Sequence, residues 1–334
     1  SGMTDALFLT SEAVDDLATP ADYVAAVRDG YREVGEGAPA EPRTLLPSGD
    51  PPGMLTTYVA MLPEVGAMGG YTYAAGFAER DAWFLTPLFD AETGEPLAVI
   101  DGASMNPFKT GAAGAVAVDA LARPDASTVA VIGSGPQARG QLRTTATVRD
   151  LTGVRVFSPT PANRESFADE FAERLDADVT AVSSASAALA GADIVITATT
   201  ASEPVIADAD VEPGTHVTAM GQYAADKHEL PPELVARATY VPDLTARATR
   251  DAGSFIAARE AGLVSDDDLE VELGDVVAGS HPGRTSDDEV TVFDSGGTGI
   301  ETVAAAHMLY ERAREAGRGT PLSIAPASEA LTGR

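Results

Sequence analysis

The chain has 334 residues, which is more than one hydrophobic core usually covers, so two domains are expected. Its 51 acidic residues outnumber 22 basic ones and give a net charge of −29, which argues against nucleic acids and anionic membranes as partners, because no basic patch could neutralise their phosphates. The absence of cysteine excludes disulfides, thiolate catalysis and cysteine-ligated zinc.

The acidic residues are spread along the whole chain, and the only lysines are Lys109 and Lys227. So many like charges repel one another at ordinary salt, whereas molar salt screens them beyond about 3 Å. The composition therefore suggests a protein of a high-salt cytoplasm, with an ordinary acidic protein as the alternative. No apolar window is long enough for a transmembrane helix and no secretory signal is recognised, so a cytoplasmic location is expected.

The first part of the chain predicts a small domain rich in β-strands. A helix is expected over residues 20–35, because Pro20 can open it and apolar residues recur at helical spacing. Residues 36–53, rich in proline and glycine, are expected to form a loop. Strand-like runs alternate with turns from 54 to 100, which predicts antiparallel pairing, and a helix of small residues follows over 108–122.

From residue 127 onward, strands alternate with helices. Strands are expected at 128–132, 154–157, 179–182, 194–198, 216–220, 239–242 and 290–293. Such alternation implies right-handed crossovers and a parallel sheet with helices on both faces. The sequence thus predicts an α/β protein. Its Rossmann-type domain is expected over 121–299, after the β-rich first domain, and a final helix is expected over about 299–316.

A glycine-rich turn sits between the first of these strands and its helix. Gly133-x-Gly135-x-x-Ala138 matches the G-x-G-x-x-A pattern of dinucleotide binding, and its place after a β-branched strand supports that interpretation. Gly133 permits the tight turn, Gly135 lets the backbone approach a diphosphate, and Ala138 allows close helix packing. Pro136 fits the first helical turn, and Gln137 follows it. Free N–H groups at the helix start favour the diphosphate.

In dinucleotide-binding folds, residues at the end of the second strand contact the 2′-hydroxyl or 2′-phosphate of the adenosine ribose. An NAD-specific site usually has Asp or Glu there, but this chain has Ser158, Thr160 and Arg164, which could hold a 2′-phosphate. We therefore favour NADP(H) over NAD(H), although Arg164 could also be a solvated helix residue. The predicted cofactor contacts are completed by Thr197, Ala198, Thr199, Gly221 and Ser295.

Several ordered segments together resemble the ornithine cyclodeaminase/mu-crystallin family over nearly the whole chain. These segments are 93–102 (TGEPLAVIDG), 109–118 (KTGAAGAVAV), 132–138 (IGSGPQA) with Gln141, 227–230 (KHEL), 272–276 (ELGDV) with Gly279 and 282–284 (PGR), and 293–297 (FDSGG). The glycine loop with its glutamines is the most specific of them.

The resemblance implies that residues 3–120 and 300–334 together form a smaller α+β domain in which the Rossmann-type domain is inserted. It implies that this smaller domain binds substrate and forms a homodimer. It also implies one of three functions. The leading one is an NAD(P)-dependent imine reductase or amino-acid dehydrogenase, for example of the alanine dehydrogenase type, acting on a small α-imino or amino acid. The alternatives are an ammonia-releasing ornithine cyclodeaminase with bound NAD, and a non-catalytic NADP(H)-binding protein.

The chain departs from the family pattern at polar positions. The basic residue of a strand motif falls on Tyr71, the arginine of the R-T-[AG]-A motif on Lys109, and the aspartate before K-x-E-L on Tyr223. An acid in the last helix falls on Thr302, whereas the family's early arginine is retained as Arg43. Cyclodeamination needs an acid near the substrate's amines, which Tyr223 does not supply.

The expected chemistry assigns roles to these residues. Arg43 is the first choice for binding a substrate carboxylate, because a guanidinium can donate two parallel hydrogen bonds, and Lys109 is the second. Tyr71 or Tyr223 could donate a proton if a cation such as Lys109 lowered the phenol pKa. Asn106 could orient the substrate. The alternatives are a surface ion pair for Arg43, a solvated helix start or a phosphate contact for Lys109, and a turn residue for Asn106. For each tyrosine the alternative is a packed side chain.

The four histidines, His216, His228, His281 and His307, show no metal-binding spacing. We therefore predict no metal and structural or solvated histidines.

Overall fold

The computed structural model describes residues 4–78 and 81–332. The chain divides into two compact units, one formed by Ser1–Asn106 with Thr298–Arg334 and the other by Pro107–Gly297. They are called unit 1 and unit 2. The first domain was expected to extend to residue 120, whereas helix α3, Phe108–Leu121, groups with unit 2.

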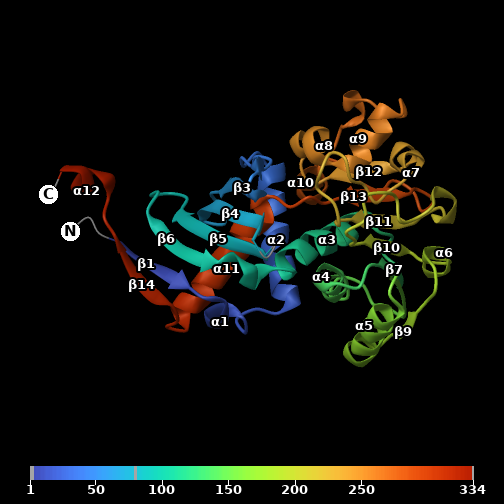
Figure 1. Ribbon diagram of the computed structural model, residues 1–334, viewed down its shortest axis with the longest axis horizontal. Coiled ribbons are helices and arrows are strands. Elements are labelled where there is room, and N and C mark those ends of the chain that lie inside the picture. The colour runs from blue at the N-terminus through green and yellow to red at the C-terminus, as the bar shows by residue number, and fades with distance from the viewer. Residues whose placement is uncertain (1–3, 79–80, 333–334) are drawn as a thin grey trace. The chain divides into compact units, whose positions relative to one another are not determined.

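Unit 1 is built on a seven-stranded sheet in the order β14-β1-β6-β5-β4-β3-β2 (Figure 1). Its strands are β1 Thr4–Leu9, β2 Thr44–Gly49, β3 Pro52–Leu62, β4 Ala67–Phe77, β5 Asp81–Asp90, β6 Pro96–Asp101 and β14 Thr320–Ile324. The expected antiparallel pairing holds from β2 through β6. The sheet is mixed, however, because β1 runs parallel to β6.

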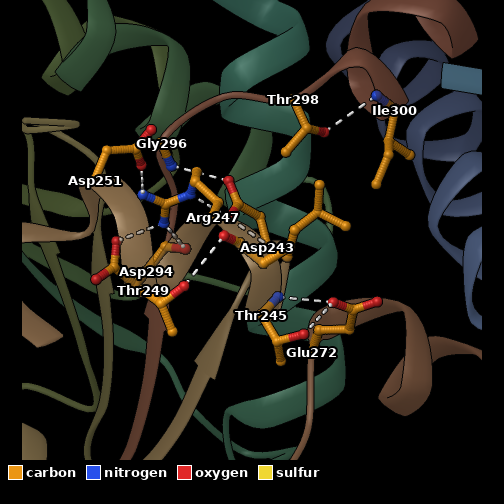
Figure 2. A network of polar contacts seen from close by, with 12 residues as sticks. Asp243, Thr245, Arg247, Thr249, Asp251, Glu272, Asp294, Gly296, Thr298 and Ile300 are labelled. Carbon is orange, nitrogen blue, oxygen red and sulfur yellow. Dashed lines mark hydrogen bonds and ion pairs between the residues drawn. The ribbon is translucent and has the colours of Figure 1, made fainter. Parts of the chain in front are cut away.

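Two long helices, α2 and α11, pack against each other in unit 1 (Figure 1). The helices of this unit are α1 Ser11–Val14, α2 Pro20–Gly35, η1 Gly102–Met105, α11 Gly299–Glu315 and α12 Ala327–Thr332. Helix α2 begins with a capping box, in which the Thr19 hydroxyl accepts from Asp22 N–H and the Asp22 carboxylate accepts from Thr19 N–H. Helix α11 begins in the same way at Thr298, whose hydroxyl accepts from Ile300 N–H (Figure 2).

The central strands of unit 1 alternate in character, as a half-buried sheet requires. In β3, Tyr58, Ala60 and Leu62 are buried, whereas Leu55, Val59 and Met61 are exposed. Helix α11 packs on β3, β4 and β5. One face of these strands therefore carries buried aromatic rings, and the other carries exposed apolar side chains.

Unit 2 contains the predicted parallel sheet, in the order β12-β13-β11-β10-β7-β8-β9. The strands are β7 Thr128–Ile132, β8 Gly153–Phe157, β9 Asp178–Ala181, β10 Ile194–Thr197, β11 His216–Ala219, β12 Thr239–Pro242 and β13 Thr291–Asp294. Each pair of neighbouring strands in this sheet runs parallel. The strand order reverses beside β7, and open α/β sheets bind ligands at the carboxyl ends of strands at such a point.

Helix α3 precedes the first strand of unit 2, and the other helices of this unit connect its strands. These others are α4 Pro136–Thr145, α5 Pro161–Arg174, α6 Ala185–Leu189, η2 Asp208–Asp210, α7 Pro232–Arg237, α8 Thr245–Asp251, α9 Gly253–Glu260, η3 Asp266–Asp268 and α10 Leu273–Ala278. Helix α3 packs closely on α4, because a Cβ on Gly114 would lie 1.9 Å from the Gln141 side chain. Gln141 in turn donates to Thr110 O, so the small-residue helix α3 and helix α4 pack together within unit 2.

The structure corrects the expected loop at 36–53, because β2 lies within it and pairs with β3 along its length. Pro47 made this segment resemble a loop in the sequence. A proline is nevertheless tolerated in a strand at the edge of a sheet, which is where β2 lies. Strands β1 and β14 and helices α7 to α10 were not predicted, because their apolar runs are short. None of the helices in the described ranges has the length and apolarity needed to span a bilayer.

Candidate functional site

The turn after β7 has the geometry of a diphosphate cradle. Gly133 adopts φ +122°, and a Cβ there would lie 2.2 Å from the Ala198 carbonyl oxygen, so a side chain is excluded. At Gly135 a Cβ would meet no described atom within 4 Å, which leaves open space beside the backbone. Gly135 precedes α4, and none of the described side chains caps that helix start. Its first N–H groups are therefore oriented to bind an anion.

Three predicted cofactor residues in unit 2 carry buried polar atoms with no hydrogen-bond partner in the described part of the chain. These atoms are Gln137 Oε1, Ser158 Oγ and Ser295 Oγ. Ser158 directly follows β8 and Ser295 directly follows β13, so both lie at the carboxyl ends of strands. Buried polar groups are nearly always satisfied in folded proteins, so these three atoms fit a polar ligand such as a dinucleotide.

Glu229 fastens two neighbouring strand ends. Its carboxylate accepts from Thr197 Oγ1 at 3.0 Å, from Thr199 N and Oγ1 at 2.8 and 2.7 Å, and from Gly221 N at 2.7 Å. Burial raises the pKa of Glu229, and these hydrogen bonds oppose the rise. The hydroxyls of Thr197 and Thr199 are thus engaged within the protein, and backbone atoms of Thr199 and Gly221 are held in place. Glu229 lies in the 227–230 segment (KHEL), but this short motif does not reveal its role in the sequence.

The end of β8 carries the residues expected to read the 2′ position. Arg164 Nη1 donates to Ser158 O at 3.0 Å, and its guanidinium carbon lies 5.6 Å from the centroid of the Phe157 ring. Arg164 therefore lies against the strand end instead of pointing freely into solvent. Thr160 is the N-cap residue of α5 but makes no side-chain capping bond among the described residues.

In unit 1, Arg43 belongs to a cluster of aromatic side chains. Its Nη1 donates to Tyr73 OH at 3.0 Å, and its guanidinium carbon lies 5.2 Å from the Tyr58 ring centroid. Tyr71 packs on Tyr58 with centroids 5.6 Å apart, and Phe84 lies 4.7 Å from Tyr73 by the same measure. Arg43, Tyr58, Tyr71, Tyr73 and Phe84 are called the aromatic cluster. It combines a buried cation with flat apolar surfaces.

Tyr71 lies in this cluster with its hydroxyl already engaged. The hydroxyl donates to Gly102 O at 2.8 Å, and a Cβ on Gly102 would lie 2.6 Å from the Tyr71 ring. Burial raises the pKa of Tyr71 well above the usual 10, and nearby Tyr58 and Glu301 raise it further. This phenol therefore stays neutral over the working pH range, which favours hydrogen bonding over proton release.

The other predicted substrate-site residues are distributed over both units. Lys109 lies in the first turn of α3 in unit 2 and is buried. Asn106 ends the short helix η1 in unit 1. Tyr223 follows β11 in unit 2 with 38% of its surface exposed. The structure thus groups Arg43 with Tyr71, while Lys109 and Tyr223 belong to unit 2.

Glu301 is a buried acid that the sequence analysis missed. Its carboxylate accepts from Thr298 N at 2.8 Å, Thr298 Oγ1 at 2.7 Å and Tyr31 OH at 3.0 Å. The capping-box pattern, Thr298 followed three residues later by an acid, was a signal that could have identified it. The family's helix acid was expected at the next residue, Thr302, whose hydroxyl donates to Thr298 O.

His216 has a structural environment. Its ring nitrogens each lie 2.9 Å from a threonine hydroxyl, Thr291 Oγ1 and Thr218 Oγ1. Burial, reinforced by the nearby positive charges of Arg284 and Arg149, lowers the pKa of His216 to about 3, so the ring is neutral. In residues 4–78 and 81–332, no group of three or more His, Asp or Glu side chains could hold a metal ion.

Comparison with known proteins agrees with this geometry. A Delta(1)-pyrroline-2-carboxylate reductase of Bacillus cereus is 36% identical over 233 residues, covering 70% of this chain and 71% of that protein. The structure of the Thermococcus litoralis enzyme of the same name, in complex with NADH and L-proline, superposes with a TM-score of 0.89 at 30% identity over 95% of this chain and 100% of that one. An archaeal alanine dehydrogenase dimer with bound NAD gives 0.88 at 30% identity over 96% and 99%. The family described as ornithine cyclodeaminase/mu-crystallin matches residues 4–317, and the chain belongs to that family.

Proposed function

We propose that the protein is an NAD(P)H-dependent reductase of small α-imino acids, which also runs in reverse as an amino-acid dehydrogenase. The observation that carries this proposal is the glycine cradle after β7 together with the three buried polar atoms of Gln137, Ser158 and Ser295. The similarity to imine reductases and to alanine dehydrogenase supports the reaction class.

The proposed cofactor residues all belong to unit 2. N–H groups at the start of α4 would hold the diphosphate, Ser158 and Arg164 the adenosine ribose, and Ser295 the nicotinamide half. The bound reduced nicotinamide would supply a hydride for the imine carbon. The chain's own contribution is to orient the ring and to exclude water from it.

Arg43 is the proposed carboxylate ligand. A guanidinium can donate two parallel hydrogen bonds to a carboxylate, and Tyr73 and Tyr58 already fix its orientation. The rings of the aromatic cluster supply an apolar surface, so we propose an imino acid with an apolar or cyclic side chain. An imine accepts hydride readily only when its nitrogen carries a proton. Lys109 and Tyr223 are the proposed groups that keep this proton in place, and Asn106 would orient the substrate.

We further propose a preference for NADP(H) over NAD(H). The β8 end offers a hydroxyl at Ser158 and a guanidinium at Arg164, and no carboxylate stands at the position that would repel a 2′-phosphate. Arg164 would have to exchange its bond with Ser158 O for one with the phosphate. Because the chemistry requires only the nicotinamide, either dinucleotide supports the reaction.

The protein is proposed to act as a homodimer in a high-salt cytoplasm. In the sheet of unit 1, neighbouring strands β2 to β5 place four apolar residues side by side in one row. The row is Leu46, Leu55, Ala74 and Trp83. Trp83 is 76% exposed and Leu46 is 61% exposed. A chain of charge −29 can meet a second copy most readily at such an uncharged face. Light scattering in molar KCl would find a dimer that Trp83→Glu converts to a monomer; a monomeric native chain would refute this part.

The function is tested by following NADPH and NADH oxidation at 340 nm in molar KCl. Delta(1)-pyrroline-2-carboxylate, or a small keto acid with ammonia, is expected to support oxidation of at least one dinucleotide. Ammonia release from ornithine without net cofactor turnover would favour a cyclodeaminase, which Tyr223 in place of an aspartate makes less suitable. Binding of the dinucleotide without either reaction would favour a non-catalytic binding protein. Both of these results contradict the proposal.

A further inference from the structure

A buried ion cluster lies at the ends of β12 and β13 in unit 2 (Figure 2). Arg247, on α8, is completely buried. Its Nε donates to Asp243 Oδ1 at 2.5 Å, Nη1 to Asp251 Oδ1 at 2.9 Å, and Nη2 to Asp294 Oδ1 at 2.9 Å. Three carboxylates thus surround one guanidinium, and the Tyr240 hydroxyl donates to the other oxygen of Asp294. The proposed chemistry uses none of these charged groups directly.

The cluster forms hydrogen bonds with main-chain atoms at the end of β13 and just after it. Arg247 Nη2 also donates to Asp294 O at 3.0 Å, and Asp243 Oδ2 accepts from Gly296 N at 2.9 Å (Figure 2). Backbone bonds from Asp243 N to Asp294 O and from Ser295 N to Ala219 O complete the attachment. The segment 294–296 is therefore held on both sides of Ser295.

Gly296 shows how closely the guanidinium approaches this segment. A Cβ at Gly296 would lie 2.5 Å from Arg247 Nη1, so only glycine leaves room for the arginine. The close approach fixes the backbone while the Ser295 hydroxyl is left without a hydrogen-bond partner among the described residues. The cluster thus binds the main chain of this segment and leaves its one hydroxyl for something else.

The order of strands indicates what that hydroxyl meets. In the proposed binding mode the 2′ position is read at β8 and the diphosphate is bound after β7. The strand order would then direct the nicotinamide half toward β10, β11 and β13. Ser295 directly follows β13, and β13 lies on the same side of β7 as β10 and β11. We propose that Arg247 is a positioning residue that holds the 294–296 segment so that the Ser295 hydroxyl meets the nicotinamide half of the cofactor. This inference rests on the proposed function.

The test compares Arg247→Lys with Ser295→Ala and with the double variant. Lysine keeps the charge but cannot donate to Asp243, Asp251 and Asp294 in one plane. We expect Arg247→Lys and Ser295→Ala each to raise the Kd of NADH, measured by its fluorescence, by about 10-fold. The double variant should be no weaker than Ser295→Ala, because the arginine acts through the serine. At saturating NADH the KM for the imine should stay unchanged.

A matched control is Arg237→Lys. Arg237 also binds a carboxylate and main-chain carbonyls, those of Asp208 and Val211, but it is partly exposed on α7. Its substitution should leave the Kd of NADH within twofold of the native value. Hydrogen exchange of a peptide covering residues 290–300 should accelerate in Arg247→Lys and remain native in the control.

Asp243→Asn is the second variant if Arg247→Lys does not fold. It weakens the acceptor shared by Arg247 and Gly296 while Asp251 and Asp294 still hold the guanidinium, and the same rise in Kd is expected. A folded variant of either kind with native NADH affinity and native exchange would overturn the inference and leave a purely stabilising ion cluster. Additive effects in the double variant would also overturn it. A native chain that binds neither NADH nor NADPH would instead refute the proposed function itself.

Discussion

The proposed cofactor site, at the carboxyl ends of the unit 2 strands, and the aromatic cluster of unit 1 are built in different ways. The first depends on backbone: Gly133 in a left-handed conformation, the open space at Gly135, and main-chain groups held by Glu229 and Arg247. The second depends on side-chain identity, with Arg43 oriented by Tyr73 and Tyr58. A site formed by main-chain geometry tolerates few substitutions, because an added side chain disturbs the backbone. In a site formed by side chains, a substitution can change which ligand is bound. The comparison predicts that the two regions fail differently when altered.

The largest expected effect comes from Gly133→Ala. Its Cβ would lie 2.2 Å from Ala198 O at a φ of +122°, so the turn must move and the cradle is lost. We expect NADH affinity to fall by about 100-fold or more. The control is Gly191→Ala, which also has a positive φ (+72°) but meets no described atom within 4 Å. That variant should lower stability by about 1 kcal/mol and leave NADH binding native. Equal NADH affinity of the two alanine variants would contradict the cradle.

The aromatic cluster is probed by Arg43→Lys. Lysine cannot donate two parallel hydrogen bonds to a carboxylate, so the KM for the imino acid should rise by about 10- to 100-fold. The Kd of NADH should be unaffected, because Arg43 belongs to the substrate-binding part of the proposal. Arg32→Lys, at an exposed ion pair with Glu36 and Glu64 in the same unit, is the control and should keep the native KM. A change in NADH affinity with unchanged imine KM would reverse the assignment.

Stability against pH tests the interior of unit 2. The folded pKa of His216 is about 3 and its unfolded value is about 6.5, so the unfolded chain binds a proton that the folded chain does not. The contribution of His216 to stability is therefore intact above pH 6.5 and is lost as the pH falls toward 3, by about 1.4 kcal/mol per pH unit. Denaturant titrations between pH 7 and pH 5 should find a shallower decline in His216→Gln. An identical decline in both proteins would exclude His216 as its source.

The smallest effect is expected from Arg164→Gln. The native arginine can exchange its bond with Ser158 O for one with a 2′-phosphate, so its loss should weaken NADPH about 5-fold relative to NADH. Arg174→Gln, in the last turn of the same helix, is the matched control and should leave the ratio native. If the ratio of NADPH to NADH affinity were unchanged in Arg164→Gln, Arg164 would have no role in cofactor preference.

The same contrast explains how far sequence reasoning reached. The glycine turn, the parallel sheet and the family were predicted, because strand–glycine–helix order depends on local backbone rules. Strand β2 was missed because Pro47 resembles a loop residue until the edge position of the strand is known. Glu229 was not assigned because its partner Thr197 lies 32 residues away along the chain, and the link from Arg247 to Asp294 spans 47 residues. Glu301 did have a local signal, the capping-box spacing from Thr298, but its bond with Tyr31 spans 270 residues.

Calorimetric titration of the native chain with NADH and NADPH in molar KCl tests the central claim most directly. We predict saturable binding of at least one dinucleotide, with one site per chain, and its loss in Gly133→Ala but not in Gly191→Ala. Absence of binding heat for both dinucleotides in a folded native chain, at concentrations well above micromolar, would contradict the account.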